Sequence, residues 1–296
     1  MITKLTNKWI SARGQDRLRH LWKRQDPEEF SLKEEDILSY QRDFRRYLQE
    51  IAEVHGKQVY EYWNEFISKG KLPSYEWLVN QIFIASELKD GRRDRHRYDR
   101  FEAPCNVLDI FQFLSQEFIK HVAESIERMN AQRIIEIGAG DGFLTFFLKR
   151  NINIHATDNF SRPFIKHQEH VEKIGHKEAL EKYNPDLVVI NWEEYEGTYS
   201  IDVLDYPSVK YMLWIGEPEG CTGSDDLWEF DCLDTKNPYC LSRVDYWNFG
   251  DEIVKKTGVF IFYPTKTGKN PWSEEDEEEW VNAEDVRHFI SYLHLD

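Results

Sequence analysis

Three glycines at alternate positions follow a short run of β-branched residues. A turn rich in glycine can bind a ligand through its backbone. Residues 134–137 contain three isoleucines, which predicts a strand buried on both faces. Gly138, Gly140 and Gly142 follow, and apolar residues then resume at helical spacing from Leu144. Glycine allows the unusual φ of a tight turn and leaves the amides at the new helix's N-terminus open to a ligand. The pattern therefore predicts a strand, a ligand-binding turn and the start of a helix.

A carboxylate at the end of the next predicted strand adds a second candidate contact. Residues 152–157 predict this strand, and Asp158 follows it, twenty positions after Gly138. Nucleotide-binding α/β folds place an acidic residue there to accept hydrogen bonds from ribose hydroxyls. We expect Asp158 to bind a cofactor that contains a nucleoside.

One alternative is a nicotinamide dinucleotide and an oxidoreductase. The dinucleotide fingerprint reads GxGxxG, and its third glycine lets helix and strand pack closely over the pyrophosphate. Here the third position is Phe143. A bulky ring opposes that fingerprint, so we rank the NAD-dependent oxidoreductase second.

The segment Glu136-Ile-Gly-Ala-Gly-Asp-Gly142 resembles the ExGxGxG first motif of class I S-adenosylmethionine (SAM) dependent methyltransferases. The resemblance covers roughly residues 133–264. It implies an α/β fold with a doubly wound, mostly parallel sheet that ends in an antiparallel strand pair, and SAM as cofactor. The cofactor-binding residues that it implies are Glu136, Gly138, Ala139, Gly140, Gly142, Asp158 and Asn159. A scaffold protein that keeps the fold and binds SAM or a nucleotide without turnover is the non-enzyme alternative.

Candidate catalytic residues follow two further predicted strands, 187–191 and 211–216. In open α/β sheets ligands lie beyond the carboxyl ends of the strands, which selects Asn191, Trp192 and Glu217. Methyl transfer from a sulfonium depends mainly on alignment, and it needs a base only if the acceptor must lose a proton. Base-methylating relatives carry Asn/Asp-Pro-Pro-Tyr where this chain has Asn191-Trp-Glu-Glu194, so the resemblance leaves the acceptor open. Trp192 fits a substrate or sulfonium contact as well as it fits the core.

The charge distribution bears on possible partners. Positive and negative residues balance over residues 1–130, so the whole formal charge of −16 falls on residues 131–296. This balance argues against a broad phosphate-binding face on the second half. We expect a small-molecule or protein methyl acceptor, with a nucleic acid disfavoured. The arginine-containing stretch 92–100 fits a solvated linker better than a phosphate-binding patch, because two aspartates interrupt it.

Cysteine usage and hydropathy predict a cytoplasmic protein without metal. The four cysteines form no CxxC pair, and a zinc site from Cys221, Cys232 and Cys240 would need an unusual fourth ligand. No apolar run approaches the roughly 18 residues of a membrane helix. The first residues contain no apolar stretch before a small-residue cleavage site, so we expect no secretion.

The elements that must position these residues divide the chain into three regions. Residues 1–130 have apolar residues at helical spacing and predict a helical region that covers the pocket near Asn191 and Glu217. Residues 131–270 alternate strands and helices and predict the SAM-binding α/β domain, and residues 271–296 predict an acidic segment with a short helix. More specifically, we expect helices over 107–129 and 225–233, and a closing strand pair of 243–249 with 259–263.

Overall fold

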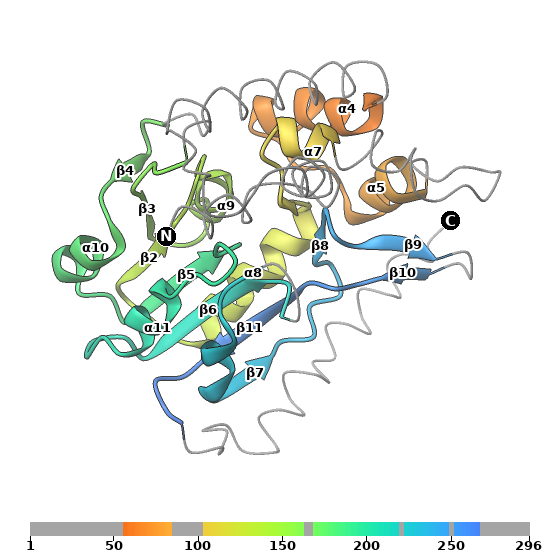
Figure 1. The fold of residues 1–296 in the computed structure, drawn as a ribbon. Coiled ribbons are helices and arrows are strands. Elements are labelled where there is room, and N and C mark those ends of the chain that lie inside the picture. Colours follow the sequence, from red (N-terminus) through yellow and green to blue (C-terminus); the bar gives the residue numbers. More distant parts are fainter. Residues whose placement is uncertain (1–55, 85–102, 163–167, 219–221, 249–251, 267–296) are drawn as a thin grey trace, which may run out of the picture.

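A computed structural model describes residues 56–84, 103–162, 168–218, 222–248 and 252–266 of the chain (Figure 1). Several of the expectations above concern other residues. The predicted helices before residue 56, the arginine-containing stretch 92–100, the acidic segment 271–296 and Cys221 all lie outside the described residues.

A seven-stranded sheet with the order β4-β3-β2-β5-β6-β11-β7 organises the described residues. Its strands are β2 (Ile134–Ile137), β3 (Ile154–Asp158), β4 (Val171–Lys173), β5 (Leu187–Asn191), β6 (Tyr211–Gly216), β7 (Cys232–Asp234) and β11 (Gly258–Phe262). Strands β2 to β6 pair in parallel, and β11 runs antiparallel to both β6 and β7. The sheet confirms the predicted α/β class, its mostly parallel pairing and its antiparallel end.

Helices cover both faces of this sheet, because successive residues of each buried strand point to opposite sides. On one face Val189 and Leu213 belong to the same apolar cluster as α8 (Gln116–Arg128) and α9 (Phe143–Leu148). On the other face Val188 and Met212 pack in a second cluster. The helices of that second cluster are α10 (His176–Tyr183) and α11 (Tyr199–Leu204). The sheet is therefore doubly wound, as Figure 1 shows.

The described N-terminal residues pack into the first of these clusters. They form α4 (Lys57–Glu65), a 3-10 turn (Ile67–Lys69), α5 (Tyr75–Leu78), a π-helical turn (Val79–Ile84) and α7 (Ala103–Val107). Val59, Tyr62 and Leu78 are buried in the cluster that also holds α8 and strand residues of the sheet. The apolar core thus continues across residue 130 without a break.

The expected helix over 107–129 is wrong in its first half. Helix α7 ends at Val107, and a short strand β1 (Gln112–Phe113) pairs antiparallel with β8 (Leu241–Ser242). Helix α8 begins only after Ser115, whose hydroxyl accepts a hydrogen bond from the Phe118 N–H at 3.1 Å. The apolar residues before Ser115 match helical spacing, but Phe113 pairs with a strand from far along the chain instead.

The expected order of the C-terminal strands is also wrong. Residues 225–233 form a 3-10 turn (Asp225–Glu229) and strand β7 instead of one helix. Strand β9 (Tyr246–Asn248) pairs with β10 (Glu252–Val254), while β11 inserts between β6 and β7. Leu227, Phe230 and Leu233 are buried, and their spacing suits a turn followed by a strand as well as it suits a helix. Local periodicity could not distinguish the two.

Candidate functional site

The glycine turn joins β2 to α9 as the sequence predicts. Gly138, Gly140 and Gly142 all have positive φ, at 70°, 59° and 72°. A Cβ on Gly138 would lie 2.9 Å from the Tyr199 hydroxyl oxygen, and one on Gly142 would clash with the Val171 side chain. Both positions therefore require glycine for conformation and for space. The backbone of the turn lies next to the end of β3.

Asp158, at the end of β3, holds the turn in place. One carboxylate oxygen accepts a hydrogen bond from the Gly140 N–H at 2.8 Å, and the other accepts one from the Phe160 N–H at 2.5 Å. The side chain is only 9% exposed. An ionised carboxylate has about four lone-pair sites, so these two bonds leave capacity for hydroxyl donors.

Glu136 lies behind the turn. Its side chain is 1% exposed, and one carboxylate oxygen accepts hydrogen bonds from the Thr145 N–H and hydroxyl. The other oxygen has no partner among the described residues. Burial raises the pKa of Glu136 to about 8, despite these bonds from Thr145. Glu136 thus links β2 to α9 and supports the turn from within the core.

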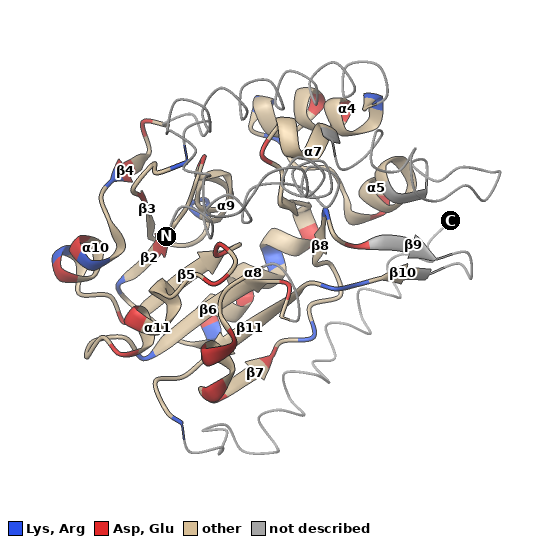
Figure 2. Cartoon of the chain, in the orientation of Figure 1, with Lys and Arg blue, Asp and Glu red and all other residues tan. Residues whose placement is uncertain are grey.

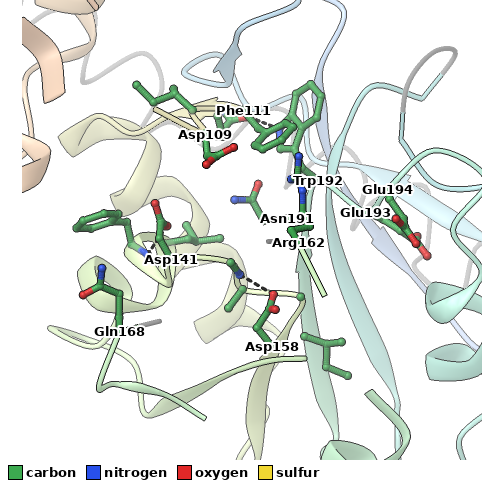
Figure 3. Close-up of a pocket in the computed structure, with 18 of the residues that line it drawn as sticks. Asp109, Phe111, Asp141, Asp158, Arg162, Gln168, Asn191, Trp192, Glu193 and Glu194 are labelled. Carbon is green, nitrogen blue, oxygen red and sulfur yellow. Dashed lines mark hydrogen bonds between the residues drawn. The ribbon is translucent and has the colours of Figure 1, made fainter. Parts of the chain in front are cut away.

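A cavity of about 500 Å³ opens between the turn, the ends of β3 and β5, and the described N-terminal residues (Figure 3). This volume is within the usual range of ligand pockets, about 300–1,000 Å³. The predicted residues that line it are Gly138, Ala139, Gly140, Asp158, Asn159, Asn191 and Trp192. Glu136, Gly142 and Glu217 are not among the lining residues. The structure thus brings most of the predicted site residues together.

Glu217 lies at the end of β6, where it belongs to a tight loop instead of the cavity wall. Its backbone N–H donates to the Thr222 hydroxyl at 2.7 Å, and that hydroxyl donates back to the Glu217 carbonyl at 2.8 Å. Its carboxylate lies 3.9 Å from the Lys256 ammonium. The glycine- and proline-containing sequence after β6 reflects this loop closure.

Asp141, inside the glycine motif, also lines the cavity and was missed as a site residue. Burial raises the pKa of Asp141 to about 7, and the negative charges of Asp109 and Asp158 add to the rise. The Phe143 N–H donates to its carboxylate at 3.3 Å. The position of Asp141 in the motif could have identified it from the sequence, because a carboxylate between two turn glycines lies close to a ligand bound at the turn.

Aromatic and charged side chains line the far end of the cavity. The rings of Phe111 and Trp192 lie 5.7 Å apart, and the Trp192 indole N–H donates to the Gln112 side-chain oxygen at 3.2 Å. Arg162 and Arg243 also line this end. The sequence analysis missed Phe111 and Arg243. The pairing of β1 with β8 brings these two residues together, and local sequence patterns do not predict this long-range pairing.

The described N-terminal residues close one side of the cavity. Tyr62, Trp63 and Ile67 line it. The Trp63 ring packs edge-on against Phe143, the first residue of α9, with centroids 5.4 Å apart. The Tyr62 hydroxyl accepts a hydrogen bond from the Leu114 N–H at 2.8 Å. Phe143 stands where the dinucleotide fingerprint GxGxxG has its third glycine. Its ring packs against the N-terminal residues at that position.

In the described ranges no group of three or more His, Cys, Asp or Glu side chains is placed to hold a metal ion. Cys105, Cys232 and Cys240 are free thiols. None of the helices within the described ranges has the length and apolar character that crossing a bilayer requires.

No family model and no curated protein sequence matches the chain. Similar solved structures include the methyltransferase domain of bacterial CtHen1, at 12% identity and TM-score 0.33, covering 50% of this chain and 98% of that one. TrmK of M. capricolum, in complex with S-adenosyl-homocysteine, has 12% identity and TM-score 0.30, with coverages of 59% and 87%. The 23S rRNA methyltransferase ErmE has 11% identity and TM-score 0.25, with coverages of 56% and 74%. These likenesses concern the course of the backbone.

The sheet order, its antiparallel end and the glycine turn after β2 together define a class I methyltransferase-like fold. This is the fold that the sequence resemblance implied.

Proposed function

We propose that this chain is a SAM-dependent methyltransferase. The observation that carries the proposal is the juxtaposition of the glycine turn with the buried Asp158 carboxylate on one wall of a ligand-sized cavity. Asp158 keeps acceptor capacity for ribose hydroxyls, and Asn159 follows it on the same wall. Asp141 and Asp158 place acidic groups where a ligand with a sulfonium and an ammonium would bind, which suits a cation.

The chain's own residues then contribute alignment. SAM supplies a methyl group on a sulfonium, whose leaving group needs no further activation. Asn191, at the end of β5, lines the cavity, and its side-chain oxygen has no partner among the described residues. The Asn191 side-chain amide borders the cavity, and in this proposal it hydrogen-bonds to the methyl acceptor and so orients its nucleophile. Trp192 forms the adjacent wall. In this proposal Glu217 shapes the loop after β6 and touches no substrate.

The acceptor in this proposal is a small molecule or a protein, and a nucleic acid is the competing class. A cytoplasmic location is part of the same proposal, supported by the free thiols of the described cysteines, which fit a reducing compartment.

Calorimetric titration with SAM, S-adenosylhomocysteine and NAD tests the cofactor. We expect the two adenosyl ligands to bind and NAD not to bind. Tight NAD binding would instead favour the oxidoreductase. Incubation with labelled SAM and cell extract, followed by protease or nuclease treatment, then tests transfer and classes the acceptor. Adenosyl binding without any transfer would favour the scaffold alternative.

A glycine variant checks that binding occurs at the turn. Gly140→Val adds a β-branched side chain at a φ of 59° beside the ligand wall, and we expect it to abolish SAM binding in a folded protein. Gly175→Ala is the matched control, since Gly175 has a φ of −75° and an added Cβ meets nothing within 4 Å. Unchanged SAM affinity in Gly140→Val would contradict the site assignment.

A further inference from the structure

Trp192 has a backbone conformation that large side chains rarely adopt. Its φ is 62°, in the left-handed region, where a bulky residue is strained. The residue directly follows β5, and its N–H donates to the Ile215 carbonyl of β6 at 2.9 Å. Strain of this kind persists only where surrounding contacts enforce it, and it is concentrated at functional sites. The conformation of Trp192 therefore calls for a functional explanation.

The fold holds the Trp192 ring as well as its backbone. The indole N–H donates to the Gln112 side-chain oxygen at 3.2 Å, and the Gln112 amide donates in turn to the Leu241 carbonyl at 2.6 Å. The Phe111 ring packs on the indole with centroids 5.7 Å apart. The pairing of β1 with β8 thus orients a ring that follows β5, before any ligand binds.

This ring borders the place where the methyl acceptor is proposed to bind. Trp192 is half-buried and lines the cavity directly after Asn191, whose amide is proposed to orient the nucleophile (Figure 3). Phe111 and Tyr195 line the same cavity. A ligand beside Asn191 therefore meets aromatic surface. Aromatic pairs are favourable beyond the area that they bury, which favours a ligand with a flat ring.

The two arginines of the cavity interact with other groups of the protein. The Arg243 guanidinium donates to the Asn106 side-chain oxygen at 2.7 Å. Burial lowers the pKa of Arg162, and nearby carboxylates oppose this lowering: Asp109, Glu194 and Asp158. Neither arginine therefore requires an anionic ligand.

The distribution of charge disfavours either sign on the ring of the acceptor. Five carboxylate residues line the cavity against two arginines: Asp109, Asp141, Asp158, Glu193 and Glu194 against Arg162 and Arg243. An anion would enter a wall with an excess of acidic groups. A cation on Trp192 would meet Arg243, whose central guanidinium carbon lies 5.9 Å from the indole centroid. A neutral ring avoids both repulsions.

From the held indole and this distribution of charge we infer that the methyl acceptor is a small neutral molecule with a flat ring. Its ring packs against Trp192, and Gln112 positions the indole for that contact. The cavity of about 500 Å³ suits a small ligand. The inference rests on the methyl transfer proposed above, and it adds the chemical class of the acceptor and the residue that selects it.

A nucleic acid, the competing class of acceptor, fits the described surface less well. The formal charge of the chain is −16. Figure 2 shows acidic side chains on α10, α11 and the turn before β7, on the outside of the sheet domain. Nucleic-acid binding draws much of its affinity from phosphate contacts with basic groups. An acidic outer surface opposes such contacts, whereas a neutral ring in the cavity does not depend on them.

NMR titration of the full chain with simple ring compounds tests this inference, with and without saturating S-adenosylhomocysteine. Phenol is flat and neutral, and cyclohexanol is its match without the flat ring. Benzoate and benzylammonium carry the ring with a negative or a positive charge. We expect phenol to bind about two- to tenfold more tightly than cyclohexanol. Both charged compounds should bind at least about threefold more weakly than phenol, because each meets repulsion in the cavity.

Substitutions of Trp192 test whether this ring makes the selection. Trp192→Leu should bring the affinities for phenol and cyclohexanol close to equality, and Trp192→Phe, which keeps a flat ring, should retain the preference for phenol. Trp228→Leu is the matched control and should leave the preference unchanged. Trp228 is also half-buried, with its ring 5.2 Å from that of Phe260, but it does not line the cavity.

A double substitution tests the positioning role of Gln112. Gln112→Met removes the oxygen that accepts from the indole N–H, so it should reduce the preference for phenol. A phenylalanine has no such N–H, so Gln112→Met should have no further effect on the preference in the Trp192→Phe background. A general loss of packing would lower the preference in both backgrounds.

Any of four results would overturn the inference: no binding of phenol, equal affinity for phenol and cyclohexanol, tighter binding of a charged ring, or an unchanged preference in Trp192→Leu. An RNA oligonucleotide that binds far more tightly than its free nucleosides would replace it with a nucleic-acid acceptor. If Trp192→Leu does not fold, the wild-type affinities and Trp192→Phe still decide. Failure of S-adenosylhomocysteine to bind would overturn the proposed function instead, and the titrations without it would still report on the ring.

Discussion

Asp158 serves the turn and the ligand with one carboxylate. Its bond to the Gly140 N–H fixes the backbone against which the cofactor should lie, and the same residue lines the cavity. An asparagine can still accept from Gly140, but it carries no charge. An alanine loses both functions. The two substitutions therefore separate turn support from ligand charge.

We predict that Asp158→Ala weakens SAM at least about tenfold, because a hydrogen bond to a charged group contributes about 1.5–3 kcal/mol. Asp158→Asn should give a smaller loss. Calorimetric titration measures both, with the exposed Asp225→Asn as control. A change below about twofold in Asp158→Ala would remove this residue from the site.

The raised pKa of Asp141 predicts a pH-dependent affinity. Between its ordinary value of 3.8 and about 7, the folded protein holds a proton that the unfolded chain has released. Stability of the ligand-free protein therefore falls as pH rises through this window. A cationic ligand favours the ionised carboxylate, so SAM should bind more tightly, with proton release, as pH rises from 5.5 to 7. Asp141→Asn should flatten this dependence, and equal pH slopes in the variant and wild type would refute it.

The sequence predicted the bounds of those strands and helices that depend only on local residue patterns. The buried apolar runs predicted for β5 and β6 matched the observed bounds, because burial on both faces leaves a continuous apolar run. The insertion of β11 between β6 and β7 was missed, because strand order depends on pairing between distant segments.

The same distinction applies to the site. The glycine turn and Asp158 follow from motif and spacing alone. Phe111 and Arg243 meet only through the register that places Phe113 opposite Leu241. Glu217 was selected by the rule that strand ends line the ligand edge, but its backbone is held there by two hydrogen bonds with the Thr222 hydroxyl. Motifs predict local geometry, and long-range pairing decides which side chains join it.

Glu136 connects β2 to α9 and predicts a pH effect on stability. Its pKa is raised from 4.5 to about 8, so ionisation destabilises the folded protein as pH rises through this range. Glu136→Gln is neutral at every pH and keeps an oxygen that can accept from Thr145. We predict that the melting temperature of the variant, relative to wild type, is higher at pH 9 than at pH 5. The exposed Glu181→Gln on α10 is the control, and equal differences at both pH values would contradict the expectation.

For the molecule as a whole, the N-terminal residues that the structure describes belong to the same core as the sheet. Val59, Leu78 and Ile82 are completely buried, in the cluster that contains α8 and β6 residues. Tyr62 and Trp63 also line the cavity. These residues therefore contribute both to the stability of the sheet domain and to the shape of the site.

We predict that Leu78→Ala destabilises the whole protein by about 2–5 kcal/mol, because it leaves a void in a close-packed core. Glu76→Ala, an exposed residue of the same helix, is the matched control and should change stability by less than about 0.5 kcal/mol. Urea unfolding followed by circular dichroism measures both.

Removal of residues 1–84 should have a larger effect than any single substitution. Each large apolar side chain that loses its burial contributes about 1.5–3 kcal/mol, and the truncation removes several of them and exposes their partners on α8. A domain has only about 5–15 kcal/mol of net stability. We therefore expect the truncated chain to lose cooperative thermal unfolding and SAM binding together. A truncated chain that melts cooperatively and binds SAM with full affinity would show that the sheet domain folds independently, and that the N-terminal residues only cover it.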